Sequence, residues 1–205
     1  MANHVSVIAL ISLSCLVATC YGNVLFSTLN PTLIVTASPS PPGQVLKAGE
    51  DTITVTWSYN SSFPSSTDSD YRTVKIMLCY APESQQDRAW RKTVDNLKKD
   101  KTCQHKIVSR PYSRSGNNTF TYTVQRDIPT ATYFVRAYAL NAHDTQLAYG
   151  QTTNAQKTTN LFGIQAITGR HVSLDIASIC FSGFSILSLF GFFYMEKRKA
   201  KSQSK

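Results

Sequence analysis

Residues 176–195 form a run of 20 residues without a charged side chain, and this run limits the possible folds more than any other feature. A helix rises about 1.5 Å per residue, so ~20 residues span the ~30 Å hydrocarbon core of a bilayer. The following segment, 196–205, carries five basic residues and one acid, which predicts that it lies in the cytosol. A glycolipid-anchor signal would end on its apolar run. We therefore expect a type I protein with one transmembrane helix over 176–195.

The other end of the chain predicts a secretory signal peptide. Residues 1–22 contain no Asp, Glu, Lys or Arg, and the nearly apolar stretch from Val5 to Val17 is followed by small residues. This pattern is typical of a signal peptide that is cut near Gly22. A buried strand or helix at the N-terminus is the alternative interpretation.

The positive charge of the chain does not indicate a nucleic-acid partner. The 205 residues carry a formal net charge of +9. The tail, 196–205, contributes +4 (five basic, one acidic), and 23–175 contribute +5 (16 basic, 11 acidic). A surplus this small on an extracytoplasmic domain is no argument for nucleic-acid binding.

Two cysteines are predicted to form a disulfide. Outside the signal peptide and the apolar span the chain has only Cys79 and Cys103, and an oxidising compartment favours their pairing. Closing a loop of ~25 residues would contribute about 3.5 kcal/mol. A zinc site formed by both cysteines and His105 is the alternative, but no C-x-x-C pair supports it. We expect no metal and no cofactor.

Two N-x-S/T sequons, at Asn60 and Asn117, lie in polar, turn-rich stretches. Both are candidate glycosylation sites in a secreted domain.

Between the two apolar ends, the hydrophobic pattern has a period of two, which predicts an all-β domain. Strands are expected at 52–59, 73–80, 119–125 and 133–140, with weaker candidates at 32–36, 103–108, 147–152 and 162–167. Seven or eight short strands indicate an antiparallel β-sandwich. We expect an extended segment over 23–44, the sandwich over 45–167 and a juxtamembrane segment over 168–175.

Two segments resemble immunoglobulin and fibronectin type III sandwiches. Residues 127–138 resemble the E–F corner and the F strand of fibronectin type III domains, and Thr52–Trp57 resembles a B strand with its core tryptophan. The two cysteines do not bracket the domain as they do in antibody domains.

The interval between the cysteines departs from the β pattern. Trp90, Val94 and Leu97 stand at i, i+4 and i+7, which predicts a short amphipathic helix or turn over 87–99. Six basic residues and three acids lie within 87–101. A solvated charged face is the alternative interpretation of such a run.

No catalytic motif is present in the sequence. It contains no G-x-S-x-G, no H-E-x-x-H and no glycine-rich phosphate loop. A single span does not enclose an ion pathway by itself. The residues alone therefore predict a type I protein whose β-sandwich ectodomain binds a partner, and no more than that.

Several blocks resemble one plant family, the high-affinity nitrate transporter-activating proteins. These blocks are 79–82 (CYAP), 87–92 (DRAWRK), 99–103 (KDKTC), 126–130 (RDIPT), 133–139 (YFVRAYA), 148–151 (AYGQ), 169–178 (GRHVSLDIAS) and 196–201 (EKRKAK). The resemblance implies a root plasma-membrane accessory subunit with an extracellular domain. Its partner would be a multi-spanning nitrate/proton symporter of the major facilitator type, which it would bind as a hetero-oligomer, stabilise and activate.

The resemblance is densest in the charged interval, so we expect the partner-binding residues there: Arg88, Trp90, Arg91, Lys92, Asp95, Lys99, Asp100 and Lys101. We expect Arg91 to donate to the partner, Asp100 to accept from it and Trp90 to hold the loop on the sandwich. In the span, Ser178, Ser182 and Ser185 form a small-residue stripe suited to helix packing.

Two other classes of protein remain open. A cell-surface receptor or adhesion module is the first, although the ten-residue tail has no room for a signalling domain. A membrane-tethered enzyme is the second, and it would need paired acids or a nucleophile in a cleft.

Overall fold

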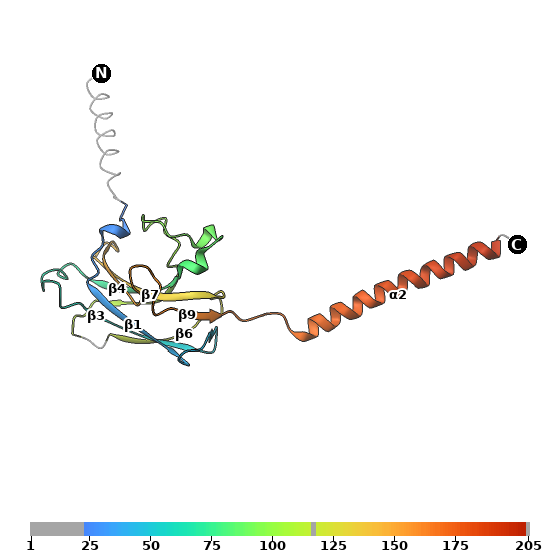
Figure 1. The fold of residues 1–205 in the computed structure, drawn as a ribbon, viewed down its shortest axis with the longest axis horizontal. Coiled ribbons are helices and arrows are strands. Elements are labelled where there is room, and N and C mark those ends of the chain that lie inside the picture. Colours follow the sequence, from blue (N-terminus) through green and yellow to red (C-terminus); the bar gives the residue numbers. More distant parts are fainter. Residues whose placement is uncertain (1–22, 116–117, 204–205) are drawn as a thin grey trace, which may run out of the picture. The chain divides into compact units, whose positions relative to one another are not determined.

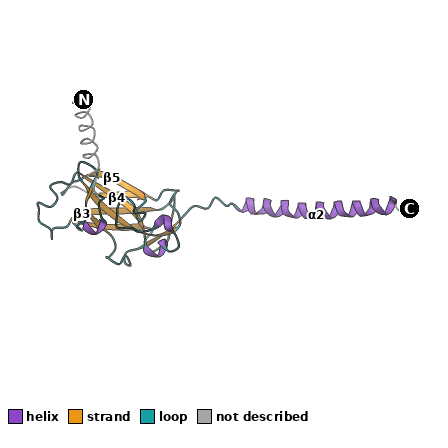
Figure 2. Ribbon diagram, turned by 90° about the horizontal axis from the view of Figure 1, so that it is seen from above, coloured by secondary structure: helices purple, strands orange, loops and turns teal. Residues whose placement is uncertain are grey.

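The computed structural model describes residues 23–115 and 118–203 (Figure 1). Residues up to Ala166 form one compact unit and those from Ile167 on form another. The first unit is built from nine strands, orange in Figure 2: β1 (Leu33–Ser40), β2 (Leu46–Lys47), β3 (Thr52–Tyr59), β4 (Thr73–Tyr80), β5 (His105–Pro111), β6 (Thr119–Thr123), β7 (Ala131–Leu140), β8 (Gln146–Gln151) and β9 (Phe162–Gln165).

The strands form the predicted β-sandwich. One sheet has the order β1-β3-β6, and the other has the order β2-β9-β7-β4-β5, with β8 also paired to β7. The short β2 runs parallel to β9, and every other pairing is antiparallel. Alternate residues of β3, among them Ile53, Val55 and Trp57, are buried in the main core, as the period of two predicts.

The corner that precedes β7 has the geometry of a tyrosine corner. The Tyr133 hydroxyl donates a hydrogen bond of 2.7 Å to the carbonyl oxygen of Pro129. A tyrosine that bonds back to the backbone at this place is a feature of immunoglobulin-like sandwiches. Together with buried Trp57, it confirms the fold class that the sequence predicts.

A second apolar cluster lies on the outer face of the larger sheet. It contains Met77 and Cys79 from β4, and Phe134, Tyr138 and Leu140 from β7. Both strands are therefore buried on both faces, which explains why β7 is almost continuously apolar in sequence. Residues 24–29 and the β4–β5 connection supply covering side chains, together with Tyr149 and Leu161.

The expected start of the sandwich at residue 45 needs correction. Strand β1 lies within the segment 23–44 and pairs along its whole length with β3. The strand candidate at 32–36 corresponds to β1, which extends four residues further and includes Pro39. Since β1 is at the edge of its sheet, a residue without an N–H is tolerated there.

The C-terminal unit contains the helix α2, Val172–Gln203. Among the described residues, one helix is long and apolar enough to cross a membrane, over Val172–Lys199. Helix α2 begins four residues before the predicted span, within the segment 168–175 that was expected to precede it. Asp175 lies in its first turn and pairs with Arg170 at 2.8 Å.

The predicted signal peptide and the two predicted glycosylation sites are not tested by the structure. The signal peptide over 1–22 and the sequon residue Asn117 lie outside the described residues. Asn60 follows β3 in a turn, where its side-chain oxygen accepts from the Ser62 N–H at 3.0 Å. Glycosylation at both sequons stays a prediction.

Candidate partner-binding loop

The β4–β5 connection, residues 81–104, is closed by the predicted disulfide between Cys79 and Cys103. We call it the stapled loop. Because the disulfide joins these two sulfurs, neither is a free thiolate for the alternative zinc site. Among the described residues, no group of His, Cys, Asp and Glu side chains could hold a metal ion.

Of the two conformations expected over 87–99, an amphipathic helix or a turn, the structure has turns and no α-helix. The stapled loop contains only two short 3-10 helices, Pro82–Gln85 and Ala89–Arg91. Asp87 has a φ of 56°, a left-handed conformation that interrupts any helix. The interior of the loop is a set of turns, in which the Lys101 N–H donates to the Lys92 carbonyl oxygen at 3.1 Å.

Arg91 anchors the first half of the stapled loop. Its side chain is only 7% exposed, and its guanidinium carbon lies 4.3 Å from the centroid of the Tyr80 ring. One terminal nitrogen, Nη1, donates to the Ser84 carbonyl oxygen at 3.2 Å. The Ser84 hydroxyl in turn accepts from the Thr132 N–H at 2.8 Å, which joins the loop to β7.

Asp100 holds the second half of the stapled loop through three hydrogen bonds to one of its carboxylate oxygens. Its Oδ1 atom accepts from the Val94 N–H at 3.2 Å, from the Thr102 N–H at 3.2 Å and from the Thr102 hydroxyl at 2.6 Å. Thr102 is fully buried and its carbonyl oxygen accepts from the Tyr80 N–H at 2.8 Å. The Asp100 carboxylate therefore ties the tip of the loop back to the end of β4.

The residues expected to bind a partner divide into inward and outward groups. Trp90 is 63% exposed, so it does not hold the loop on the sandwich as predicted; buried Arg91 does so instead. Asp95 and Asp100 both accept hydrogen bonds within the domain. The outward basic side chains are those of Arg88, Lys92, Lys98, Lys99 and Lys101.

This division makes the exposed surface of the stapled loop basic around one large aromatic ring. A shallow hollow of about 470 Å³ is lined by Gln85, Asp87, Arg88, Ala89, Lys92 and Thr93. Tryptophan and arginine are the residue types enriched at the energetic centres of protein interfaces, whereas lysine is depleted there and contributes positive charge around them.

His105 lies where the stapled loop joins β5. Its Nε2 is 3.0 Å from the Tyr80 hydroxyl. Burial lowers the pKa of His105, the Arg91 charge lowers it further, and the Asp127 carboxylate acts in the opposite direction. The imidazole is therefore held in its neutral form at neutral pH.

Sequence reasoning missed Arg136, which is 1% exposed in the middle of β7. Its guanidinium carbon lies 4.2 Å from the centroid of the Phe26 ring and 5.3 Å from that of Phe134. Gln151 Oε1 accepts from Nε and Nη2 of Arg136, at 3.3 and 3.0 Å. The sequence did contain a signal for this site, because Arg136 is the one charged residue in the otherwise almost apolar strand β7.

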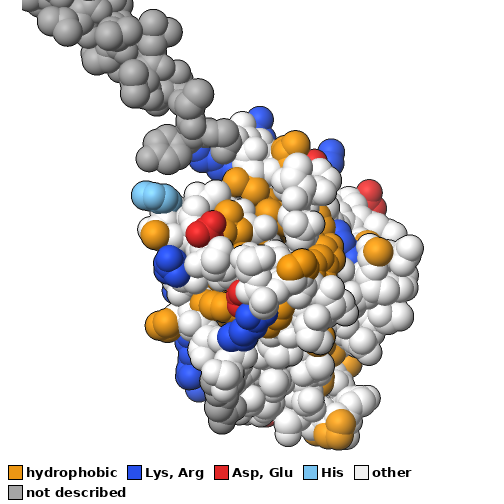
Figure 3. All heavy atoms as spheres, turned by 90° about the vertical axis from the view of Figure 1, so that its left-hand side faces the viewer, with side chains coloured by type: hydrophobic (Ala, Val, Ile, Leu, Met, Phe, Trp, Pro, Cys, Tyr) orange, Lys and Arg blue, Asp and Glu red, His pale blue; other side chains and the backbone are white. Residues whose placement is uncertain are grey.

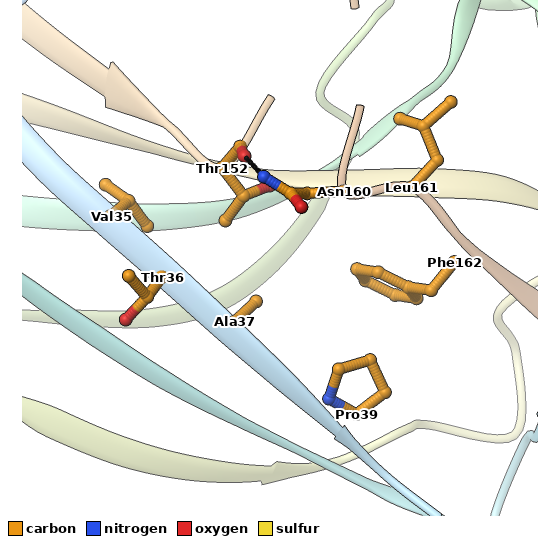
Figure 4. Close-up of a pocket in the computed structure, with 8 residues that line it drawn as sticks. All are labelled: Val35, Thr36, Ala37, Pro39, Thr152, Asn160, Leu161 and Phe162. Carbon is orange, nitrogen blue, oxygen red and sulfur yellow. Dashed lines mark hydrogen bonds between the residues drawn. The ribbon is translucent and has the colours of Figure 1, made fainter. Parts of the chain in front are cut away.

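A cavity of about 320 Å³ next to β1 is lined by apolar and neutral polar side chains (Figure 4), among them Asn160, whose amide donates to the Thr152 carbonyl oxygen at 2.8 Å. On the face in Figure 3, hydrophobic side chains are exposed in small groups among charged ones. The residues that line the cavity include no acidic or basic side chain and no histidine.

Comparison with known proteins identifies the family. The family model described as high-affinity nitrate transporter accessory, Ig-like domain, matches residues 26–169. The chain belongs to this family. It is 57% identical over 176 residues to "High-affinity nitrate transporter 3.1" of Arabidopsis thaliana, covering 84% of this chain and 83% of that protein. It is 50% identical over 176 residues to "High-affinity nitrate transporter-activating protein 2.1" of Oryza sativa subsp. japonica, covering 86% of this chain and 82% of that protein.

Membership confirms the resemblance on which the sequence prediction rested. The match begins at residue 26, before β1, and so includes residues 26–29 of the covering segment, which was expected to lie outside the sandwich. The serines of the predicted packing stripe, Ser178, Ser182 and Ser185, all lie on α2.

Proposed function

We propose that this chain is a non-catalytic type I accessory subunit of a multi-spanning high-affinity nitrate carrier in the plasma membrane. The partner is a nitrate/proton symporter of the major facilitator type, which the chain binds as a hetero-oligomer, stabilises and activates. The sandwich lies outside the cell, α2 spans the membrane and the basic tail lies in the cytosol. The observation that carries the proposal is the family match over nearly the whole sandwich.

The stapled loop is the proposed carrier-binding surface. Trp90 is its apolar anchor, and Arg88, Lys92, Lys99 and Lys101 provide the surrounding positive charge. This chemistry fits an acidic, partly apolar extracellular face on the carrier. Arg91, Asp95 and Asp100 act by shaping the loop, since the side chain of each makes a hydrogen bond within the domain.

The helix α2 is proposed to contact the carrier as well as to anchor the chain. Small side chains at Ser178, Ser182 and Ser185 allow a neighbouring helix to approach closely, and packing drives association in lipid. Exchanging residues 176–195 for an unrelated apolar span tests this. Full retention of carrier activation would reduce the helix to an anchor.

The experiment that tests the proposed surface is co-purification of the carrier with variants of the full-length chain. Trp90→Ala and the double variant Arg88→Ala/Lys92→Ala should fold and yet recover less than about a tenth of the carrier, because hot-spot truncations cost ~2 kcal/mol or more. Lys47→Ala is the control, since the Lys47–Glu50 pair is exposed and 3.9 Å apart. A soluble ligand in place of the carrier would instead support the receptor or adhesion alternative.

A further inference from the structure

Residues 24–29 cross the second half of the stapled loop and pair with it. The Phe26 N–H donates to the Asp95 carbonyl oxygen at 2.7 Å, and the Leu97 N–H donates to the Val24 carbonyl oxygen at 3.0 Å. Leu25 and Asn96 form an antiparallel β-bridge between these two bonds. We call Val24–Leu29 the N-terminal clamp.

The clamp also binds the loop through a side chain. The Asp95 carboxylate accepts from the Ser27 N–H at Oδ1 and from the Ser27 hydroxyl at Oδ2, both at 2.8 Å. Two charge-assisted bonds to one carboxylate fix its orientation better than one would. Residues 68 positions apart in sequence are thereby held together.

The clamp is attached to the sheet independently of the loop. The Phe26 ring lies 4.5 Å from the Tyr149 ring and is covered by the Arg136 guanidinium at 4.2 Å. Leu29 is buried in the second cluster. Just beyond the clamp, the Asn30 carbonyl oxygen accepts from the Tyr149 N–H at 3.0 Å. The clamp therefore has a fixed base on β7 and β8.

The clamped residues support the turn that carries the exposed lysines. The Asn96 carbonyl oxygen accepts from the N–H groups of Lys99 and Asp100, both at 2.9 Å. The Asn96 side-chain oxygen accepts from the Lys98 N–H at 3.0 Å. A change in the position of Asn96 would consequently move Lys98 and Lys99 together.

We propose that the N-terminal clamp positions the stapled loop for carrier binding, with Ser27 as a positioning residue that acts through Asp95. This inference rests on the proposed function, because it assigns a cause to the geometry of the same surface. If processing occurs near Gly22, the clamp comprises the first residues of the mature chain, so the mature N-terminus itself sets the shape of the carrier-binding surface.

The test uses the full-length chain with its carrier and two readouts, hydrogen exchange of the loop amides and carrier affinity. Asp95→Ala removes the acceptor of both Ser27 bonds, and Ser27→Ala removes the hydroxyl bond alone. Ser27→Thr keeps the hydroxyl and should restore both readouts. Thr28→Ala is the matched control, because the Thr28 hydroxyl donates to Leu25 within the clamp at 2.7 Å and does not reach the loop.

In Asp95→Ala we expect the Leu97 amide to exchange ~10-fold faster, with β4 and β7 unchanged, and carrier affinity to fall ~5- to 10-fold. Ser27→Ala should show a smaller change in the same direction, and the double variant should match Asp95→Ala, because both act through one contact.

Three results would overturn the proposal: unchanged exchange at Leu97, faster exchange with unchanged affinity, or losses of affinity that add in the double variant. Failure of the stapled loop as the carrier-binding surface gives a different result from failure of the clamp proposal. In that case Trp90→Ala would recover the carrier in full, whatever the clamp variants do.

Discussion

The guanidinium of Arg91 stacks over the ring of Tyr80, with 4.3 Å between its central carbon and the ring centroid. Tyr80 is the last residue of β4, so the stack holds the first half of the stapled loop against the end of the sheet. Trp90, one residue earlier, is left on the surface. The packing of one residue thus determines the exposure of its neighbour.

Removing Arg91 should loosen the stapled loop. Arg91→Ala loses the stacking and the bond to Ser84, so the free energy of unfolding should fall by about 2 kcal/mol. Urea unfolding of the full-length chain in detergent measures this. Arg88→Ala, an exposed neighbour, is the control and should change stability by less than ~0.5 kcal/mol. If Arg91→Ala and Arg88→Ala lost the same amount of unfolding free energy, the anchoring role of buried Arg91 would be contradicted.

Asp100 offers a test of whether its oxygen or its charge matters for the loop. Asp100→Asn keeps an oxygen that can accept from Val94 and Thr102, whereas Asp100→Ala removes it. We expect Asp100→Ala to cost ~2 kcal/mol and to speed exchange of the Val94 amide, with Asp100→Asn in between. If the two variants lose the same stability, charge alone is the source of the effect.

Gly150 should not tolerate a side chain. A Cβ at this position of β8 would overlap the carbonyl oxygen of Leu33 at the start of β1. Gly150→Ala should therefore destabilise the domain by ~3 kcal/mol, because the main chain of β1 or β8 would have to move to make room for the new methyl group. In Gly163→Ala the new Cβ would lie 3.4 Å from Val45 Cγ2, an ordinary contact. A smaller loss for Gly150→Ala than for Gly163→Ala would contradict the close approach of β1 and β8.

The lowered pKa of His105 predicts that the stability of the domain depends on pH. Its pKa in the folded domain is lowered by burial and by Arg91, with Asp127 opposing. The unfolded chain, with a histidine pKa of about 6.5, therefore takes up the proton first. Stability is at its full value above about pH 6.5 and falls as the pH drops towards the folded-state pKa. Unfolding midpoints at pH 7.5 and 5.5 measure the difference, and His105→Gln should reduce it.

The strands were the part of the fold most accessible from the sequence. The bounds of β3 and β4 agree residue for residue with the predicted 52–59 and 73–80, because alternate residues of both strands are apolar and buried in the main core. The two-sided burial of β7 likewise follows from its continuous apolar run. The predicted strand at 32–36 ends before the end of β1 at Ser40, because proline interrupts a strand pattern unless the strand is known to lie at a sheet edge.

The stapled loop was the least accessible part. The spacing of Trp90, Val94 and Leu97 is helical, but long-range partners decide the conformation: Tyr80 for Arg91, Thr102 for Asp100 and Ser27 for Asp95. Such contacts leave no periodic signal. The sequence could indicate which residues gather in the loop, and it could not indicate which of them face solvent.

Nitrate uptake by cells that express the carrier with or without this chain tests the central claim most directly. We expect high-affinity uptake when the carrier is expressed with the parent chain or with Lys47→Ala. Uptake should fall close to the level of the carrier alone with Trp90→Ala or Arg88→Ala/Lys92→Ala, at equal amounts of chain on the cell surface. Uptake equal to the parent with both loop variants would contradict the stapled loop as the carrier-binding surface, and uptake independent of the chain would contradict the accessory role itself.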